Sequence, residues 1–448
     1  MKQVVVIGGG FAGLSAAVEL AERGLQPLLL EGRPYLGGRA YSFTDAATGE
    51  PVDNGQHALM GCYRHTLAFL DRIGAGGKVV RQPNLRVAMA HAGVGSGVIA
   101  CLPLPSPLHI LGGVLGYGLL RPSERWRVLT GGLRVLAMYR RNDPVLATAT
   151  VTELLTAVGQ STNAQATFWN PVAVATLNEA PERAAAGPFA AVLAKAFFAS
   201  RRDSQFILPR VGLSDLYTQD ARRFVESRGG RVELHARVTR LELADDRLAA
   251  VHVYDGRRLT GDAYVLAVPP RALAPLLPDG VREHEPFRHL ERFGDSPIVS
   301  VHLWFDREVL GPEFLGLVGT TTQWVFNRTK LQHVGNGGPG QSVSAVISAG
   351  REVARWDSAQ IAATVIDELR SLLPEARAAE VTRQVVVKEK HATISNTPDV
   401  ERLRPPAETP IRNLFLGGDW TATGLPPTIE SAVMSGHRAA ALSAAHLQ

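Results

Sequence analysis

The sequence predicts an α/β fold in which a Rossmann-like domain is interleaved with a second domain of mixed helices and strands. A strand–glycine loop–helix–strand unit opens the chain, and another strand, ending in Gly-Gly-Asp, lies near residue 419. Two stretches without nucleotide-binding motifs separate these units. We therefore expect the Rossmann-like domain to use residues 1–75, 206–270 and 386–448, and the second domain to use residues 76–205 and 271–385.

The first unit has the pattern of a nucleotide-binding βαβ motif. Val4–Ile7 is a β-branched run suited to a buried parallel strand, residues 14–23 have helical periodicity, and Leu28–Leu30 is a second strand that ends in Glu31. The intervening Gly8–Gly13 is a G-x-G-x-x-G loop, and Glu31 follows it at the distance expected of a ribose-binding acid.

Each glycine of this loop has a separate physical role. Gly8 permits the sharp turn out of the strand, Gly10 lets the backbone approach a pyrophosphate, and Gly13 lets the helix pack on the strand. Phe11 and Ala12 begin the helix, whose free N–H groups favour phosphate. The motif predicts dinucleotide binding without separating FAD from NAD.

Composition narrows the function classes. The chain has 448 residues, 45% of them hydrophobic and 20% charged, with a net charge of +5 that is scattered and almost entirely arginine. This pattern does not favour nucleic acid. Cys62 and Cys101 form neither a metal-ligand pair nor a disulfide framework, so we expect no metal site and a reducing compartment. The first strand begins at residue 4 with no signal peptide before it, which predicts a cytoplasmic protein.

Two further glycine-containing segments are candidates for a ligand site. In Gly37-Gly38-Arg39 the backbone can pass close to a ligand while Arg39 reaches a phosphate, although a surface turn would have the same composition. Gly55-Gln56-His57 suits either a loop or the wall of a cofactor site.

Residues 102–120 are the most apolar stretch, and they are punctuated by proline and glycine. The breaks make a membrane-spanning helix untenable. The stretch fits either the lining of a lipid-sized tunnel or a lip that dips into a membrane face, or else ordinary buried core. Residues 76–205 are expected to be mostly helical, above all residues 122–200, which end in an alanine-rich helix over residues 188–200. Residues 213–270 are expected to return to helix and strand, and residues 273–380 to contain further strands and one amphipathic helix.

The last unit complements the first. A strand delivers Gly417-Gly418-Asp419 to the edge where parallel strands end, and a helix begins near Ile429 after two prolines. Asp419 can accept hydrogen bonds from a polyol chain, and the helix N-terminus can stabilise negative charge on a reduced ring.

Together, these motifs resemble the flavoprotein superfamily of amine oxidases, protoporphyrinogen oxidases and carotenoid desaturases, in which both chain ends bind one non-covalent FAD. Several segments more closely resemble the squalene-associated FAD-dependent desaturases: 53–57 (DNGQH), 102–108 (LPLPSPL), 159–161 with 168–171, 175–178, and 418–421 with 424–426. The resemblance spans the whole chain.

The resemblance implies specific roles. Gly8, Gly10, Phe11, Ala12 and Gly13 would hold the pyrophosphate, Glu31 the adenosine ribose, and Gly38-Arg39 a phosphate. Val238 would meet the adenine, Gly55, Gln56 and His57 would lie along the flavin, and Gly418, Asp419 and Ile429 would contact its ribityl chain and pyrimidine edge.

The implied reaction is reductive removal of the allylic hydroxyl from hydroxysqualene, a C30 isoprenoid, to give squalene for hopanoid biosynthesis. His57 is the candidate proton donor, and an external reductant of unspecified identity is required. Peripheral contact with the inner membrane face would suit such a substrate.

Three alternatives stay open. A phytoene-type desaturase would run the hydride in the opposite direction. A flavin amine oxidase is disfavoured because neither Lys195 nor Lys330 lies in a motif that could be tied to the flavin. A lipid carrier that kept its FAD without catalysis would have the same motifs.

Overall fold

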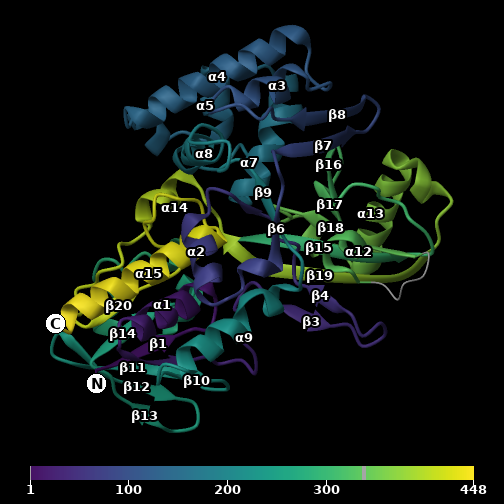
Figure 1. The fold of residues 1–448 in the computed structure, drawn as a ribbon. Helices are drawn as coiled ribbons and strands as arrows, with labels where there is room; N and C mark the ends of the chain where they lie inside the picture. The colour runs from purple at the N-terminus through teal and green to yellow at the C-terminus, as the bar shows by residue number, and fades with distance from the viewer. Residues whose placement is uncertain (1, 335–339) are drawn as a thin grey trace.

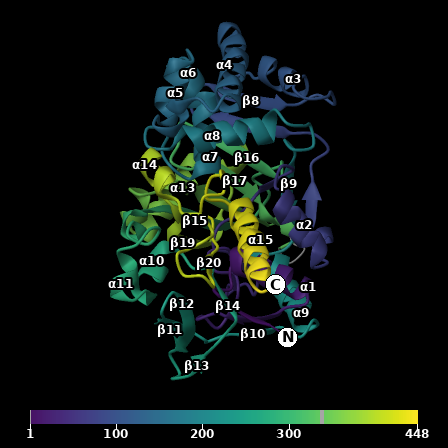
Figure 2. The same ribbon diagram turned by 90° about the vertical axis from the view of Figure 1, so that its left-hand side faces the viewer.

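The computed structural model describes residues 2–334 and 340–448. The chain forms three tiers along its long axis (Figure 1). A parallel sheet flanked by helices lies at one end, near both termini, a large mixed sheet lies in the middle, and a layer of helices lies at the other end. A view at right angles shows the same three tiers (Figure 2).

The parallel sheet takes its strands from distant parts of the chain. Its order is β10-β2-β1-β14-β20, and all neighbours run parallel. The strands are β1 (Gln3–Ile7), β2 (Gln26–Leu30), β10 (Arg231–Glu233), β14 (Ala263–Leu266) and β20 (Leu414–Leu416). Their carboxyl ends therefore meet at one edge, where ligands bind in sheets of this kind.

Each face of this sheet is covered by a different layer. Val4 and Val6 face α1 (Phe11–Glu22), α9 (Leu213–Glu226) and α15 (Ile429–His446). Val5 and Ile7 face the small sheet of β11 (Val238–Ala244), β12 (Arg247–Val253) and β13 (Arg258–Leu259). The continuous apolar run of β1 is thus buried on both faces, as predicted for a parallel strand.

Helices α1 and α15 pack unusually closely. A Cβ built on Gly436 of α15 would lie 2.2 Å from the carbonyl oxygen of Ala12, and Ser15 Oγ donates to the Val433 carbonyl at 3.3 Å. The first and last helices therefore lie side by side, as Figure 1 shows.

The middle tier is a seven-stranded sheet in the order β19-β15-β18-β17-β16-β7-β8. Its strands are β7 (Arg86–His91), β8 (Gly95–Ala100), β15 (Asp295–Phe305), β16 (Phe314–Val318), β17 (Trp324–Asn327), β18 (Gln341–Ile347) and β19 (Val381–Ile394). Helix α13 (Ser358–Leu372) covers one face of it.

This sheet corrects two sequence expectations. Residues 76–205 were expected to be mostly helical, yet they supply β7 and β8, because β7 pairs in parallel with β16 from a distant part of the chain. The expected boundary between residues 385 and 386 falls inside β19, which pairs with β15 along nearly its whole length. The third segment of the Rossmann-like domain therefore begins after Ile394. The other domain boundaries stay predictions.

The helical tier follows β8. It contains α3 (His109–Leu115), α4 (Pro122–Arg140), α5 (Val151–Ala157), α6 (Thr162–Ala164), α7 (Asn170–Leu177) and α8 (Ala186–Val192), with π-helical turns at Gln165–Trp169 and Leu193–Phe197. The alanine-rich helix expected over residues 188–200 is thus shorter and ends in a π turn.

Shorter elements connect the tiers. They are β3 (Ser42–Thr44) with β4 (Pro51–Asp53), the sheet of β5 (Leu59–Met60), β9 (Phe206–Pro209) and β6 (Val79–Arg81), and helices α2 (Arg64–Arg72), α10 (Pro270–Leu273), α11 (Asp279–Arg282), α12 (Arg328–Gln332) and α14 (Pro398–Leu403). Within residues 2–334 and 340–448, every helix is too short or too polar to cross a membrane.

Candidate active site

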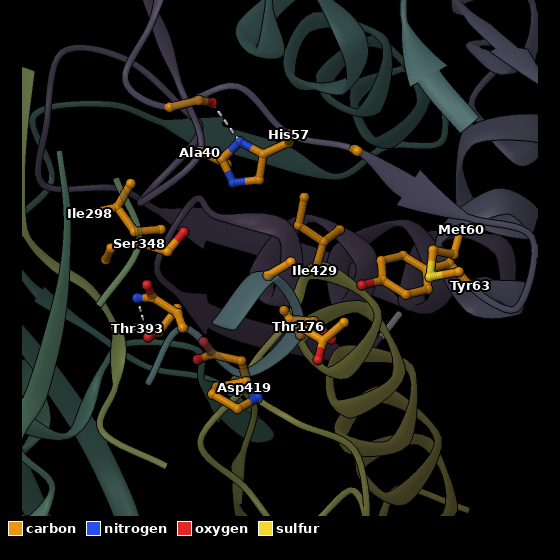
Figure 3. Close-up of a pocket in the computed structure, with 18 of the residues that line it drawn as sticks. Ala40, His57, Met60, Tyr63, Thr176, Ile298, Ser348, Thr393, Asp419 and Ile429 are labelled. Carbon is orange, nitrogen blue, oxygen red and sulfur yellow. Dashed lines mark hydrogen bonds between the residues drawn. The ribbon is translucent and has the colours of Figure 1, made fainter. Parts of the chain in front are cut away.

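One large cavity, with a volume of about 1070 Å³, joins the three tiers. It begins at the carboxyl edge of the parallel sheet, continues past the face of the middle sheet opposite α13, and ends among the helices. All site residues predicted from the sequence line it except Gly13, which packs behind the loop. The structure therefore brings together residues from the first 57 positions, from β11 and from the last 31 positions (Figure 3).

The glycine loop is shaped by close backbone contacts. Gly8 has a φ of +110°, and a Cβ on Gly13 would lie 1.8 Å from the Gly8 carbonyl oxygen. Only glycine fits at Gly13, because the obstructing atom belongs to the backbone.

The space beside Gly10 fits a phosphate group. Gly10 and Gly38 face each other closely, since a Cβ on Gly38 would lie 3.0 Å from the Gly10 Cα. Gly10 is the N-cap of α1 and supplies no side-chain cap, so the first N–H groups of that helix have no capping acceptor. Free donors beside side-chain-free backbone suit the pyrophosphate of a dinucleotide.

Glu31 supports the loop as well as lining the cavity. Its Oε2 accepts a hydrogen bond from Gly9 N at 2.7 Å, and its Oε1 accepts one from Arg33 N at 2.9 Å. A carboxylate has lone pairs for further donors, so these bonds orient the group and leave it able to bind a ribose hydroxyl.

Tyr217 on α9 holds the second glycine segment in place. Its ring stacks on Phe11 with a centroid separation of 3.7 Å, and its hydroxyl lies 2.9 Å from the Gly37 carbonyl oxygen and 3.1 Å from that of Ala40. Burial raises the pKa of Tyr217, which keeps the hydroxyl protonated as a donor. No local sequence pattern identifies Tyr217, because the carbonyls it contacts lie about 180 positions away.

Arg39 pairs with Asp419 across the two ends of the chain. Arg39 Nη2 lies 2.5 Å from Asp419 Oδ1. Burial alone would lower the pKa of Arg39, but the carboxylates of Asp419, Asp295 and Glu389 together outweigh burial and raise that pKa. Arg39 was expected to reach a phosphate, and it lies at the cavity with Nη2 engaged by Asp419 and Nη1 donating to the Ala392 carbonyl at 3.3 Å.

Arg404, also missed from the sequence, fixes the loop that carries Asp419. Its side chain is fully buried and donates to the carbonyls of Asp419 (2.7 Å), Thr421 (3.0 Å) and Leu425 (2.6 Å). Glu430, at the start of α15, accepts from the backbone N–H of His65 and Thr66 and so caps α2. These contacts hold the N-terminus of α15 against the cavity.

His57 faces the cavity in a defined tautomeric state. Its Nδ1 lies 2.6 Å from the Gly55 carbonyl oxygen, and a carbonyl can only accept, so Nδ1 carries the proton. Burial lowers the pKa of His57, which favours the neutral ring. A neutral ring with its proton on Nδ1 presents a lone pair at Nε2. This differs from the donor role expected from the sequence.

Beyond His57 the cavity becomes an apolar chamber. Its walls include side chains from residues 102–120, from the other helices of the helical tier and from the middle sheet, namely Leu108, Ile110, Leu111, Val114, Tyr117, Leu129, Phe168, Val172, Phe197, Ile298, Phe314, Trp324 and Phe326. The stretch at 102–120 is therefore a cavity wall. Within the described residues no lysine lines the cavity, and both Lys195 and Lys330 are solvent-exposed.

The cavity has two mouths of opposite character. Leu108 and Leu133 line it and are also 48% and 51% exposed, which marks an apolar opening between α3 and α4. At the other end, Arg33, Arg237 and Arg271 line it and are exposed, which marks a basic opening beside the parallel sheet.

The chain matches a known protein family and is similar in sequence to curated proteins. Residues 11–442 match the family model of flavin containing amine oxidoreductases. Hydroxysqualene dehydroxylase of Sinorhizobium fredii is 31% identical, over 99% of this chain and 98% of that protein. A 15-cis-phytoene desaturase of an Oncidium hybrid is 27% identical, over 97% of this chain and 76% of that protein.

A solved structure shares the fold. Cyclohexylamine oxidase of Brevibacterium oxydans superimposes with a TM-score of 0.73 at 15% identity, and the match covers 100% of this chain and 99% of that one. At this identity the likeness concerns the fold alone.

Proposed function

The chain belongs to the family of flavin-containing amine oxidoreductases and is an FAD-dependent oxidoreductase, and we propose that it removes the allylic hydroxyl of hydroxysqualene reductively, giving squalene. The observation that carries this proposal is the continuity of the cavity. A glycine cradle for a dinucleotide leads without interruption into an apolar chamber that opens through an apolar mouth. Such a chamber suits a long hydrocarbon with a single polar group.

Different residues of the chain would hold different parts of FAD. FAD, when bound and reduced, would supply a hydride, and the hydroxyl would leave as water after taking up one proton. The glycine loop and the N-terminus of α1 would hold its pyrophosphate, Glu31 its ribose, and Val238 its adenine. Asp419, held by Arg39, and the N-terminus of α15 at Ile429 would orient the ribityl chain and the ring edge. The apolar walls exclude water, which protects the hydride from competing protonation.

A single-turnover experiment tests the reaction. The protein is reduced with dithionite under anaerobic conditions, excess reductant is removed, and hydroxysqualene is added. We expect reoxidation of the flavin together with squalene in the organic extract. Unchanged flavin absorbance would contradict the proposal and would favour a lipid carrier.

A carotenoid-type desaturase is the second candidate, and the likeness to phytoene desaturase supports it. That reaction moves hydride from substrate to oxidised FAD. Incubating the oxidised protein with phytoene and with squalene distinguishes the two, because bleaching of the flavin by either hydrocarbon would favour desaturation. Three relatives named hydroxysqualene dehydroxylase match nearly the full chain, and they favour the first candidate.

We further propose that this protein is cytoplasmic and that the apolar mouth of its cavity docks on the inner face of a membrane. Leu102, Leu104 and Trp126 are 43%, 41% and 60% exposed near this mouth. Helix α4 carries four arginines, and its only acidic residue, Glu124, is buried. The helix therefore has a net positive charge that suits anionic lipid.

Sedimentation with anionic phospholipid vesicles tests the docking. Trp126→Asp should weaken binding. Tyr254→Asp is the matched control, because Tyr254 is 75% exposed in a loop beside β12 and β13, at the end of the molecule opposite α4 (Figure 1). Equal binding by the two variants would contradict the assignment of the surface.

A further inference from the structure

The apolar chamber contains few polar atoms without a partner, and two of them have complementary chemistry. His57 Nε2 has a free lone pair, because the ring proton is committed to the Gly55 carbonyl. Ser348 Oγ makes no hydrogen bond within the described residues, where only the backbone N–H of Ser348 is engaged, with Gln323. Both side chains line the cavity, and Figure 3 shows both directed into it.

Strand register places these two residues in the same part of the chamber. Ile347 pairs with Val299, so Ser348 and Ile298 follow at corresponding positions, and both line the cavity. Two residues further along β15, Ser300 Oγ lies 3.6 Å from the position of a Cβ on Gly55. Gly55 in turn holds the His57 ring, which therefore lies beside this end of the sheet.

Of the neighbouring polar side chains, Thr176 and Thr393 already make hydrogen bonds, whereas the buried amide of Gln56 and the hydroxyl of Ser300 make none within the described residues. Thr176 Oγ1 donates to the Val172 carbonyl at 2.8 Å, and Thr393 Oγ1 accepts from Asn178 Nδ2 at 2.9 Å. The wall around them is apolar, with Ile298 and Ile429 close by (Figure 3).

An alcohol needs one acceptor for its hydrogen and one donor for its oxygen. We propose that His57 and Ser348 form a hydroxyl-binding subsite, in which His57 Nε2 accepts a hydrogen bond from the substrate hydroxyl and Ser348 Oγ donates one to its oxygen. This inference rests on the proposed function and names its specificity-determining residues. The chamber then distinguishes an alcohol from a hydrocarbon of the same skeleton, because a hydrocarbon leaves both groups buried and unpaired.

Binding to the oxidised protein tests the subsite without turnover. Flavin absorbance changes are titrated with hydroxysqualene and with squalene, for the unsubstituted protein and for His57→Phe, Ser348→Ala and Thr176→Val. We expect each of the first two substitutions to weaken binding of the alcohol about tenfold, the order of one lost hydrogen bond, and to change squalene binding less than about twofold.

Thr176→Val is the matched control, since its hydroxyl is committed to the backbone and its loss should leave the ratio of the two affinities unchanged. His57→Gln restores an acceptor and should recover part of the preference. If His57→Phe loses FAD, Ser348→Ala alone decides the matter. If His57→Phe and Ser348→Ala leave the ratio of the affinities for hydroxysqualene and squalene unchanged, whether or not both affinities fall, the subsite is overturned and the proposed function is not. Failure of the unsubstituted protein to bind either ligand would overturn the proposed function as well.

Discussion

Tyr217→Phe isolates one hydroxyl that supports the cofactor cradle. The side chain is fully buried, so water cannot replace the lost donor to the carbonyls of Gly37 and Ala40. One hydroxyl proton serves one acceptor at a time, so the loss corresponds to a single buried hydrogen bond, about 1–1.5 kcal/mol. The ring that stacks on Phe11 is kept, so packing is unchanged.

If the whole loss acts on the FAD-bound state, the dissociation constant for FAD rises about five- to twelvefold. The assay removes FAD, then follows quenching of flavin fluorescence as FAD is added back. Tyr264→Phe is the control: this equally buried tyrosine on β14 lies outside the cavity lining, and its hydroxyl donates to the Ala249 carbonyl at 3.1 Å and accepts from Gly261 N at 2.8 Å. If Tyr264→Phe weakened FAD binding as much as Tyr217→Phe, our assignment of Tyr217 to the cradle would be refuted.

Three further substitutions probe the fold and the site. Gly13→Ala should abolish FAD binding and most soluble protein, because its Cβ would collide with the Gly8 carbonyl; flavin content after purification measures this. Arg404→Met should lower the thermal unfolding midpoint and release FAD, since three buried carbonyls lose their donor at about 1–3 kcal/mol each. Asp45 accepts hydrogen bonds from Arg383, which lowers the pKa of Asp45 from 3.8 to about 2. The stability from this pair is therefore present above about pH 4 and lost as pH falls towards 2, so Asp45→Asn should flatten the unfolding midpoint over that interval.

Local patterns in the sequence predicted the cradle well. The β-branched run of Val4–Ile7, the spacing of Gly8, Gly10 and Gly13, and the terminal Asp419 each report their structure through adjacent residues, because turn geometry and strand burial are local properties. FAD as cofactor and the superfamily were confirmed by the family match. The individual binding roles stay predictions.

Local sequence patterns could not predict contacts between residues that are distant in the chain. Tyr217 and Arg404 look like ordinary helix and loop residues until folding brings backbone carbonyls to them. β7 was not expected to join the middle sheet, because its partner β16 lies more than 200 residues away. The tautomer of His57 also required the structure, since it depends on where the Gly55 carbonyl points.

The close packing of α1 against α15 has a consequence for how the protein matures. β20 and α15 are synthesised about 400 residues after the glycine loop, so the nascent polypeptide first carries that loop without Asp419 or the helix that packs beside it. Until then the apolar flank of α1 is uncovered. The contacts expected of Asp419 and α15 with FAD can therefore form only after this late segment has docked, and until then the uncovered flank of α1 is open to aggregation or proteolysis.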